Sequence, residues 1–147
     1  MAARPLLAGL TRSLFLREGL SGTQVELLDA EGIDGFPPMP DSAGADLLGL
    51  AHEALLAPDD RKARGAHYTP PALADRLVRL TLPSGAERVL DPACGGGAFL
   101  LALIRAGVPE PVGVELDSLA AEVARAATAL ARAGQPAEVI VADFLEL

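Results

Sequence analysis

The chain has 147 residues and a formal net charge of −8, with half of its residues hydrophobic and 22% charged. This composition fits one ordinary domain, or a large part of one, and excludes wholesale disorder. A single cysteine excludes an intramolecular disulfide and fits a reducing cytoplasm, and the acidic balance disfavours a chain that grips a nucleic-acid backbone by itself.

Residues 1–64 are predicted to form a helical N-terminal segment with a Pro/Gly-rich linker. Leu and Phe recur at helical spacing from about residue 3 to 18, and Gly19 ends that helix. Arg12 and Arg17 interrupt its apolar stretch, so it fails as a secretory signal. The longest uncharged run, at 92–104, is too short to cross a membrane. We therefore expect a cytoplasmic protein with no membrane partner.

The linker is the stretch "DGFPPMPDSAG", and a second helix is predicted over "AGADLLGLAHEALL". Asp41 or Ser42 is expected to cap this helix, which ends before Pro58. Its expected buried face consists of Leu47, Leu48, Ala51 and Leu55.

A charged loop is predicted next, in which Arg61, Lys62 and Arg64 form the only local basic cluster. We interpret that cluster as solvated, with a phosphate contact as the alternative. The stretch "HYTPPALADRLVRL" then predicts a helix that begins at the Pro70–Pro71 pair. Its inward face is expected to consist of Leu73, Leu77 and Leu80.

From residue 87 the pattern changes to strand, helix, strand, helix, strand. The strands are "ERVLDP", "PVGVEL" and "AEVIVADF"; the helices are "GGAFLLALIRAG", closed by Gly107, and "DSLAAEVARAATALARAG", closed by Gly134. Short joints between such elements indicate a parallel sheet with right-handed crossovers. The predicted fold class is α/β, with three parallel strands, flanking helices and a helical N-terminal segment.

Each predicted strand ends in an acid, namely Asp91, Glu115 and Asp143, and residues 95–97 are three glycines. Ligands bind beyond the carboxyl ends of strands in an open parallel sheet. Backbone N–H groups of the glycine turn suit an anionic group, and Glu115 is placed to accept from a ribose diol. Asp143 is placed to accept from an adenine amine, with Phe144 beside it. Together these residues predict a site for an adenosine with an anionic end.

Each of the three acids also has a structural alternative. Asp91 would then cap the turn, Glu115 would be solvated, and Asp143 would cap a helix that "FLEL" begins. Cys94 is interpreted as a small packing residue rather than a nucleophile, since no histidine is near it in sequence. His52 and His67 lack metal-ligand spacing and are taken as bystanders, so no metal is expected.

Two motifs in particular carry a resemblance to a known family. "DPACGGGAFL" and "GAHYTPPALADRLV" resemble the cofactor motif and the Tyr-Thr-Pro segment of the N6-adenine DNA methyltransferases of restriction–modification systems, above all types I and IIG. "LLGLAHEALL", "VGVELD" and "VIVADFLEL" resemble further segments of the same enzymes, from about Ala45 to the end. These are class I enzymes that use S-adenosylmethionine on a Rossmann-like sheet. One departure is His67, where the family often has an aromatic residue.

The resemblance implies a role for each matching residue. Residues 65–147 would be the cofactor-binding half of the methyltransferase domain. Glu115 would hold the ribose hydroxyls, Asp143 would bind the adenine amino group, and Phe144 would lie against the ring. The methionine and ribose would be flanked or lined by Tyr68, Thr69, Pro70, Asp91, Pro92, Gly95 and Gly97, with Phe99 packed underneath.

The family's catalytic motif, Asn/Asp-Pro-Pro-Tyr/Phe, is absent from the 147 residues. That motif follows the fourth strand, which in related folds pairs with the first, so the sheet is expected to be incomplete and its edge open. The chain alone is expected to be inactive, with a complementary polypeptide or a second copy at the open edge and double-stranded DNA bound only by the complete enzyme. The alternatives are a methyltransferase portion for RNA or protein, and a non-catalytic interaction module.

Overall fold

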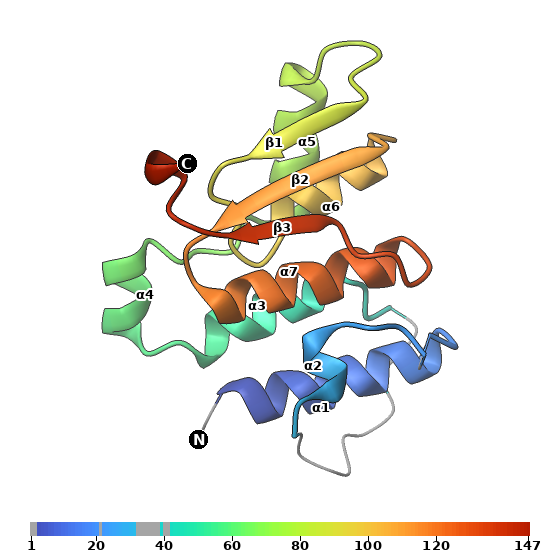
Figure 1. Ribbon diagram of the computed structural model, residues 1–147, viewed down its shortest axis with the longest axis vertical. Coiled ribbons are helices and arrows are strands. Elements are labelled where there is room, and N and C mark those ends of the chain that lie inside the picture. The colour runs from blue at the N-terminus through green and yellow to red at the C-terminus, as the bar shows by residue number, and fades with distance from the viewer. Residues whose placement is uncertain (1–2, 21, 32–38, 40–41) are drawn as a thin grey trace.

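The computed structural model describes residues 3–20, 22–31, 39 and 42–147. Three strands, β1 (Arg88–Asp91), β2 (Glu110–Glu115) and β3 (Glu138–Val141), pair in parallel in the order β1-β2-β3. The crossover helices are α6 (Ala98–Arg105) and α7 (Ser118–Ala131). The α/β fold predicted from the sequence is therefore confirmed (Figure 1).

The strand register assigns the two faces of the sheet. Val89 pairs with Pro111, and Gly113 pairs with Val139, so these residues share the face on which α6 and α7 pack. Gly113 is required there, because a Cβ at this position would lie 2.6 Å from the Cys94 Sγ. The opposite face carries Leu90, which remains exposed.

The long helix α7 lies against both the sheet and the N-terminal helices. Asp117 starts it: its carboxylate accepts from the backbone N–H groups of Leu119 (2.9 Å) and Ala120 (3.0 Å). The alanine-rich face permits close approach of the neighbouring backbone. At Gly97, which begins α6 with φ +92°, an added Cβ would lie only 3.2 Å from the Ala124 Cα.

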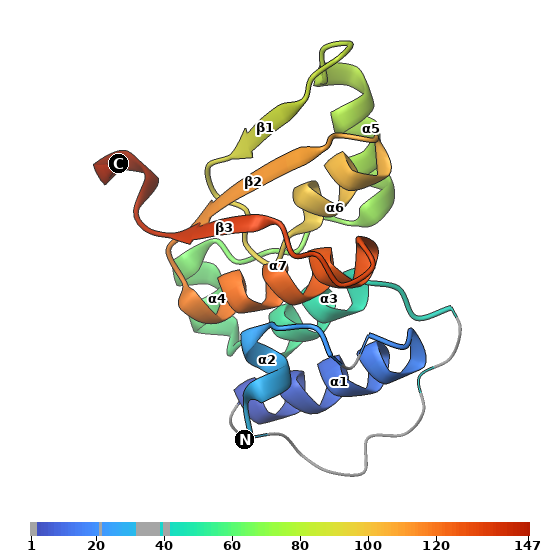
Figure 2. The same cartoon turned by 45° about the vertical axis from the view of Figure 1, so that its right-hand side comes forward.

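The N-terminal helices belong to the main hydrophobic core. Helix α1 (Ala3–Arg17), the short α2 (Glu26–Asp29) and α3 (Asp46–Leu55) lie on the side of α7 away from β1 (Figures 1 and 2). Phe15 of α1 is fully buried in a cluster with Leu48 and Val123. The proposed division between residues 1–64 and 65–147 stays a prediction, although this cluster draws on both sides of it.

The structure corrects several expectations about the helices before the sheet. Helix α4 (Pro58–Arg64) stands where a charged loop was expected; Pro58 begins it and Gly65, at φ +60°, ends it. The N-cap of α3 is Ala45, without a side-chain bond, so Ser42 is not the cap. Asp41 and most of the linker lie outside the described residues. In α3, Leu48 is buried as expected, but Leu55 is exposed.

Helix α5 (Pro71–Thr81) begins at the proline pair as predicted, but it buries the other face. The expected inward residues Leu73, Leu77 and Leu80 are 48%, 39% and 73% exposed. Ala74 and Val78 are buried instead, because α5 packs closely on α6 and small side chains fit that contact. The prediction of the buried face was therefore wrong.

Within the described ranges, every helix is too short or too polar to cross a bilayer.

Candidate cofactor site

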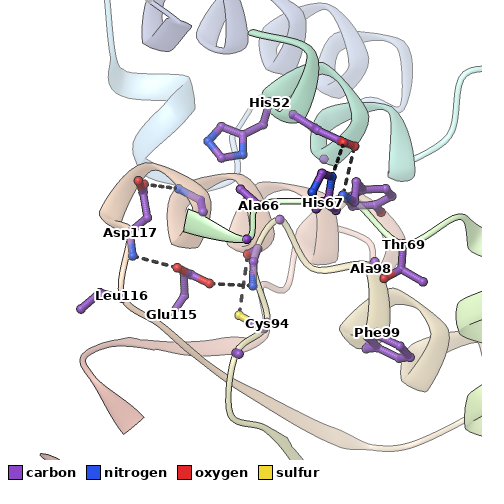
Figure 3. A pocket seen from close by; sticks show the side chains of 18 of the residues that line it. His52, Ala66, His67, Thr69, Cys94, Ala98, Phe99, Glu115, Leu116 and Asp117 are labelled. Carbon is purple, nitrogen blue, oxygen red and sulfur yellow. Dashed lines mark hydrogen bonds and ion pairs between the residues drawn. The ribbon is translucent and has the colours of Figure 1, made fainter. Parts of the chain in front are cut away.

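A cavity of about 550 Å³ lies at the carboxyl ends of the strands, between the glycine turn and helix α3 (Figure 3). Three of the residues predicted for the site, Pro70, Asp91 and Gly97, do not line it. The predicted site residues that line it are Tyr68, Thr69, Pro92, Gly95, Phe99, Glu115, Asp143 and Phe144.

The glycine turn joins β1 to α6 and forms one wall of the cavity. The backbone N–H of Cys94 donates to the carbonyl of Val114 (2.9 Å), which fixes the turn to β2. Gly95 adopts φ +53°, a left-handed conformation that favours glycine. A Cβ built there meets no atom within 4 Å, so any side chain would project into open space that the glycine leaves to a ligand.

Glu115 ends β2 and connects the turn to the start of α7. One oxygen accepts from the Gly95 N–H (2.8 Å) and the other from the Asp117 N–H (2.8 Å). The alternative of a merely solvated Glu115 is therefore incorrect. An ionised carboxylate has about four acceptor sites, so both oxygens retain capacity for hydroxyl donors.

Asp91 lies behind the turn rather than on the cavity wall. Its Oδ1 accepts from the Ala93 N–H (3.1 Å), so Asp91 caps the turn, as one of the two interpretations of the sequence predicts. Its Oδ2 is enclosed and has no hydrogen-bond partner within the described part of the chain. Burial raises the pKa of this carboxyl, the Ala93 N–H lowers it, and the charge of Glu115 raises it further.

Asp143 and Phe144 flank the cavity beyond β3. The Asp143 Oδ1 accepts from the Leu145 N–H (2.9 Å) and caps the 3₁₀ helix η1 (Phe144–Glu146). The alternative that Asp143 caps a helix begun by "FLEL" is therefore confirmed. Both residues nevertheless line the cavity, and the Phe144 side chain is partly exposed. Capping occupies one carboxylate oxygen of Asp143, so its other oxygen can still accept from a ligand. The Phe144 ring takes no part in the cap and can contact the same ligand.

The opposite wall comes from α3 and from the segment between α4 and α5. Glu53 accepts from the Tyr68 N–H (3.0 Å), and its other oxygen lies 3.4 Å from the His67 Nδ1. Figure 3 shows His52 and His67 on the side of the cavity away from Glu115 and Cys94. Pro70 is the N-cap of α5, and Phe99 packs against the cluster below the turn.

The side chains that line the cavity carry mainly negative charge. Among the residues that the structure describes, the carboxylates of Glu53, Glu115, Asp117 and Asp143 line it and no lysine or arginine does, although the Arg61 Nη1 lies 4.0 Å from the Glu53 Oε1. Such a wall attracts a cation and repels phosphate groups. No group of three His, Cys, Asp or Glu side chains suited to a metal occurs among the described residues.

A known protein family matches most of the chain that forms the cavity, although the match ends before Asp143 and Phe144. The family model described as N-6 DNA Methylase matches residues 43–132, from just before α3 to the end of α7. The chain belongs to this family. Members of the family use S-adenosylmethionine, and the 147 residues form part of an N-6 DNA methylase domain.

Two curated relatives belong to restriction–modification systems. The type I restriction enzyme MjaVIII methylase subunit of Methanocaldococcus jannaschii is 36% identical over 90 residues, which is 56% of this chain and 15% of the relative. The type II methyltransferase M.XamI of Xanthomonas campestris pv. amaranthicola is 36% identical over 108 residues, 67% of this chain and 20% of the relative. The chain thus spans a fifth or less of their length.

One solved structure is also similar. It is described as the modification subunit of a type I restriction enzyme from Vibrio vulnificus YJ016. The match has a TM-score of 0.46 and 23% identity, and it covers 81% of this chain and 27% of the other.

The residues that α3 contributes to the site were missed by sequence reasoning. Gly49 opposes the turn: a Cβ on Gly96 would lie 3.1 Å from the Gly49 Cα. A glycine inside a helix lowers helix stability, so Gly49 within "LLGLA" was a signal of close backbone approach. His52, taken as a bystander, also lines the cavity, although nothing assigns it a function.

Cys94 is the only cysteine, so its reactivity can be measured without ambiguity. Its side chain is buried, and burial, with the charges of Asp91 and Glu115, raises the pKa of the thiol from 9.0 to about 12. Because the pKa is raised on folding, the thiol's contribution to the free energy of unfolding is fully present below pH 9 and is lost as the pH rises toward 12. We expect Ellman's reagent at pH 8 to react at least about 100-fold more slowly with the folded than with the urea-unfolded chain. Equal rates would contradict the packing role.

Proposed function

We propose that the chain binds S-adenosylmethionine in this cavity and forms the cofactor-binding part of a site-specific DNA adenine-N6 methyltransferase. The observation that carries the proposal is the hydrogen bond of Glu115 to the glycine turn, on a wall whose described charged side chains include four carboxylates and neither lysine nor arginine. A sulfonium cation suits such a wall. The diphosphate of a dinucleotide cofactor does not, because the carboxylates would repel it.

The residues present fit this cofactor. The open side of Gly95 admits a ligand directly against the backbone, where a side chain would fill the space. Glu115 has acceptor sites left for ribose hydroxyls, Asp143 for an adenine amine, and Phe144 offers an apolar wall. Tyr68, Thr69 and Pro92 bound the remaining space. When bound, S-adenosylmethionine supplies an electrophilic methyl group.

Three of the predicted contacts are restricted by the structure. Gly97 packs against α7, and Asp91 holds the turn from behind, so we assign both to shaping the site. The enclosed Asp91 Oδ2 lacks a hydrogen-bond donor among the described residues. Pro70 acts at the start of α5 rather than on the ligand.

DNA adenine is the proposed substrate because the family is that of N-6 DNA methylases and both curated relatives are restriction–modification methylases. The printed 147 residues contain no Asn/Asp-Pro-Pro-Tyr/Phe sequence. We propose that the residues that hold a flipped-out adenine come from another part of the enzyme. We propose that the chain alone transfers no methyl group.

The surface around β1 is the proposed place for that other part. In the described part of the chain β1 is an edge strand, and its own Leu90 and Leu77 of α5 are both exposed. A complementary polypeptide that adds a parallel strand to β1 would cover both. Analytical ultracentrifugation should show concentration-dependent association of the isolated chain, reduced in Leu77→Lys. A monomer that unfolds cooperatively at all concentrations would contradict the open edge.

Isothermal titration calorimetry tests the cofactor assignment. The chain should bind S-adenosylmethionine and S-adenosylhomocysteine with a dissociation constant in the micromolar to submillimolar range, and should bind NAD at least tenfold more weakly. With tritiated S-adenosylmethionine and mixed-sequence DNA, the chain alone should give no label in DNA. Tight NAD binding would contradict the assignment, and label in DNA would contradict the need for another polypeptide.

A further inference from the structure

Tyr68 lies between helix α3 and the glycine turn and touches both. Its ring occupies the space above Gly49, where an added Cβ would be 1.9 Å from the Tyr68 Cε2. On the other side, a Cβ on Gly96 would lie 3.6 Å from the Tyr68 Cδ2. The ring is thus packed on one glycine in a helix and adjoins a second glycine in the turn.

Two polar contacts from the same helix hold Tyr68 in that position. Its hydroxyl donates to the Asp46 Oδ1 (2.6 Å), and its backbone N–H donates to the Glu53 Oε2 (3.0 Å). Residues 46, 49 and 53 lie at helical positions i, i+3 and i+7, which share one face. One face of α3 therefore contacts the hydroxyl, the ring and the backbone of a single residue.

Asp46 is itself held by a charged contact. Its Oδ2 lies 3.0 Å from the Arg105 Nη1, and the Arg105 Nε lies 2.8 Å from the Asp75 Oδ1. These ion pairs connect α3, α6 and α5. Burial, followed by the bond to Asp46, raises the pKa of Tyr68 above its ordinary value, so the phenol remains a hydrogen-bond donor.

We propose that Asp46 and Glu53 are positioning residues that act through Tyr68 on Gly96, that Gly49 borders Gly96 directly, and that this face of α3 so sets the place of the glycine turn that receives the cofactor. The inference rests on the proposed function for the identity of the ligand. The geometric part, that α3 controls the turn, does not depend on it. The face is separate from the acids at the strand ends, and α3 lies outside the sheet and its crossovers.

The test compares Tyr68→Phe, Asp46→Asn and the double variant with the wild-type chain. Val78→Ala is the matched control, because Val78 is buried on α5 and takes no part in these contacts. Amide NMR shifts of Gly95 and Gly96 in the free protein report the turn. Tyr68 is the only tyrosine, so one ¹⁹F signal of 3-fluorotyrosine reports the ring. Calorimetry gives the affinity for S-adenosylmethionine.

In the free protein, Tyr68→Phe and Asp46→Asn should move the Gly95 and Gly96 amide signals, and Val78→Ala should leave them in place. Each of the two variants should weaken S-adenosylmethionine binding about tenfold, as loss of one charged hydrogen bond predicts. The double variant should also lose about tenfold rather than a hundredfold, because Asp46 acts through the Tyr68 hydroxyl. Cofactor addition should shift the ¹⁹F signal.

Several results would overturn the inference. Unchanged glycine amides in both single variants would do so whether or not the wild-type chain binds the cofactor. If the wild-type chain binds S-adenosylmethionine and Val78→Ala and Asp46→Asn weaken that binding equally, Asp46 contributes only to the general stability of the fold. Additive losses in the double variant would show that Asp46 does not act through Tyr68. Absence of binding by the wild-type chain, with the amide shifts as expected, would instead refute only the proposed function.

Discussion

Replacement of Glu115 by alanine is expected to weaken S-adenosylmethionine binding by about 100-fold, which corresponds to about 2.7 kcal/mol. The carboxylate accepts from the Gly95 and Asp117 N–H groups, so its loss leaves two donors unpaired and loosens the turn. It also removes the proposed acceptor for the ribose hydroxyls. Hydrogen bonds to a charged group contribute about 1.5–3 kcal/mol each, so a loss of this size follows even with partial compensation by water.

Glu110→Ala is the control for this change. Glu110 lies at the other end of the same strand, is exposed, and contributes an ion pair with Arg88 (3.6 Å) that stabilises the fold little. Calorimetry should give wild-type affinity for Glu110→Ala. A loss below about threefold in Glu115→Ala, with the protein folded by circular dichroism, would show that the ligand does not contact this carboxylate.

Phe15→Ala is expected to lower the free energy of unfolding by about 3–5 kcal/mol, because the ring is fully buried and its removal leaves a cavity in the core. Phe15 belongs to α1, which precedes the family-matched residues 43–132. Its cluster includes Leu48 of α3 and Val123 of α7, so the change should affect the same cooperative unit that carries the site. Urea unfolding followed by circular dichroism measures the loss.

Leu16→Ala provides the comparison at the next position. Leu16 is 66% exposed, so its removal should change stability by less than about 1 kcal/mol. If α1 were an independent attachment, Phe15→Ala would leave the main unfolding transition unchanged. Such an outcome would contradict the shared core.

The sheet and its crossovers were predictable because their signals are local. The short apolar runs and the Gly107 and Gly134 stop signals define strands and helices without knowledge of tertiary contacts. The acids at the strand ends could be placed together because parallel strands share one carboxyl edge. Glu115 and Asp143 accordingly line one cavity, whereas Asp91, the last residue of β1, accepts from the Ala93 N–H of the turn and does not line it.

The orientation of α5 was not predictable from its own residues. Leucines at 73, 77 and 80 define an apolar face, but periodicity does not state which neighbour covers it. In the folded chain the smaller side chains of Ala74 and Val78 are buried against α6. Helix α4 begins at Pro58 and ends before Gly65, both of which are typical helix boundary residues. The charged residues between them led to the prediction of a loop instead.

The contribution of α3 to the site was beyond sequence reasoning for a different reason. Tyr68 contacts Asp46 and Glu53 across separations of 22 and 15 residues, and only the folded chain brings them together. The Tyr-Thr-Pro resemblance indicated that Tyr68 belongs near the cofactor. It did not reveal that the ring is held from behind by a helix.

Calorimetric titration of the purified 147-residue chain with S-adenosylmethionine at low salt tests the cofactor site itself. We expect saturable binding at one site per chain, at least tenfold stronger than that of NAD or ATP, since phosphates meet a wall of carboxylates. Absence of heat and of thermal stabilisation at millimolar S-adenosylmethionine, in a chain shown to be folded, would show that these residues do not form a cofactor site by themselves.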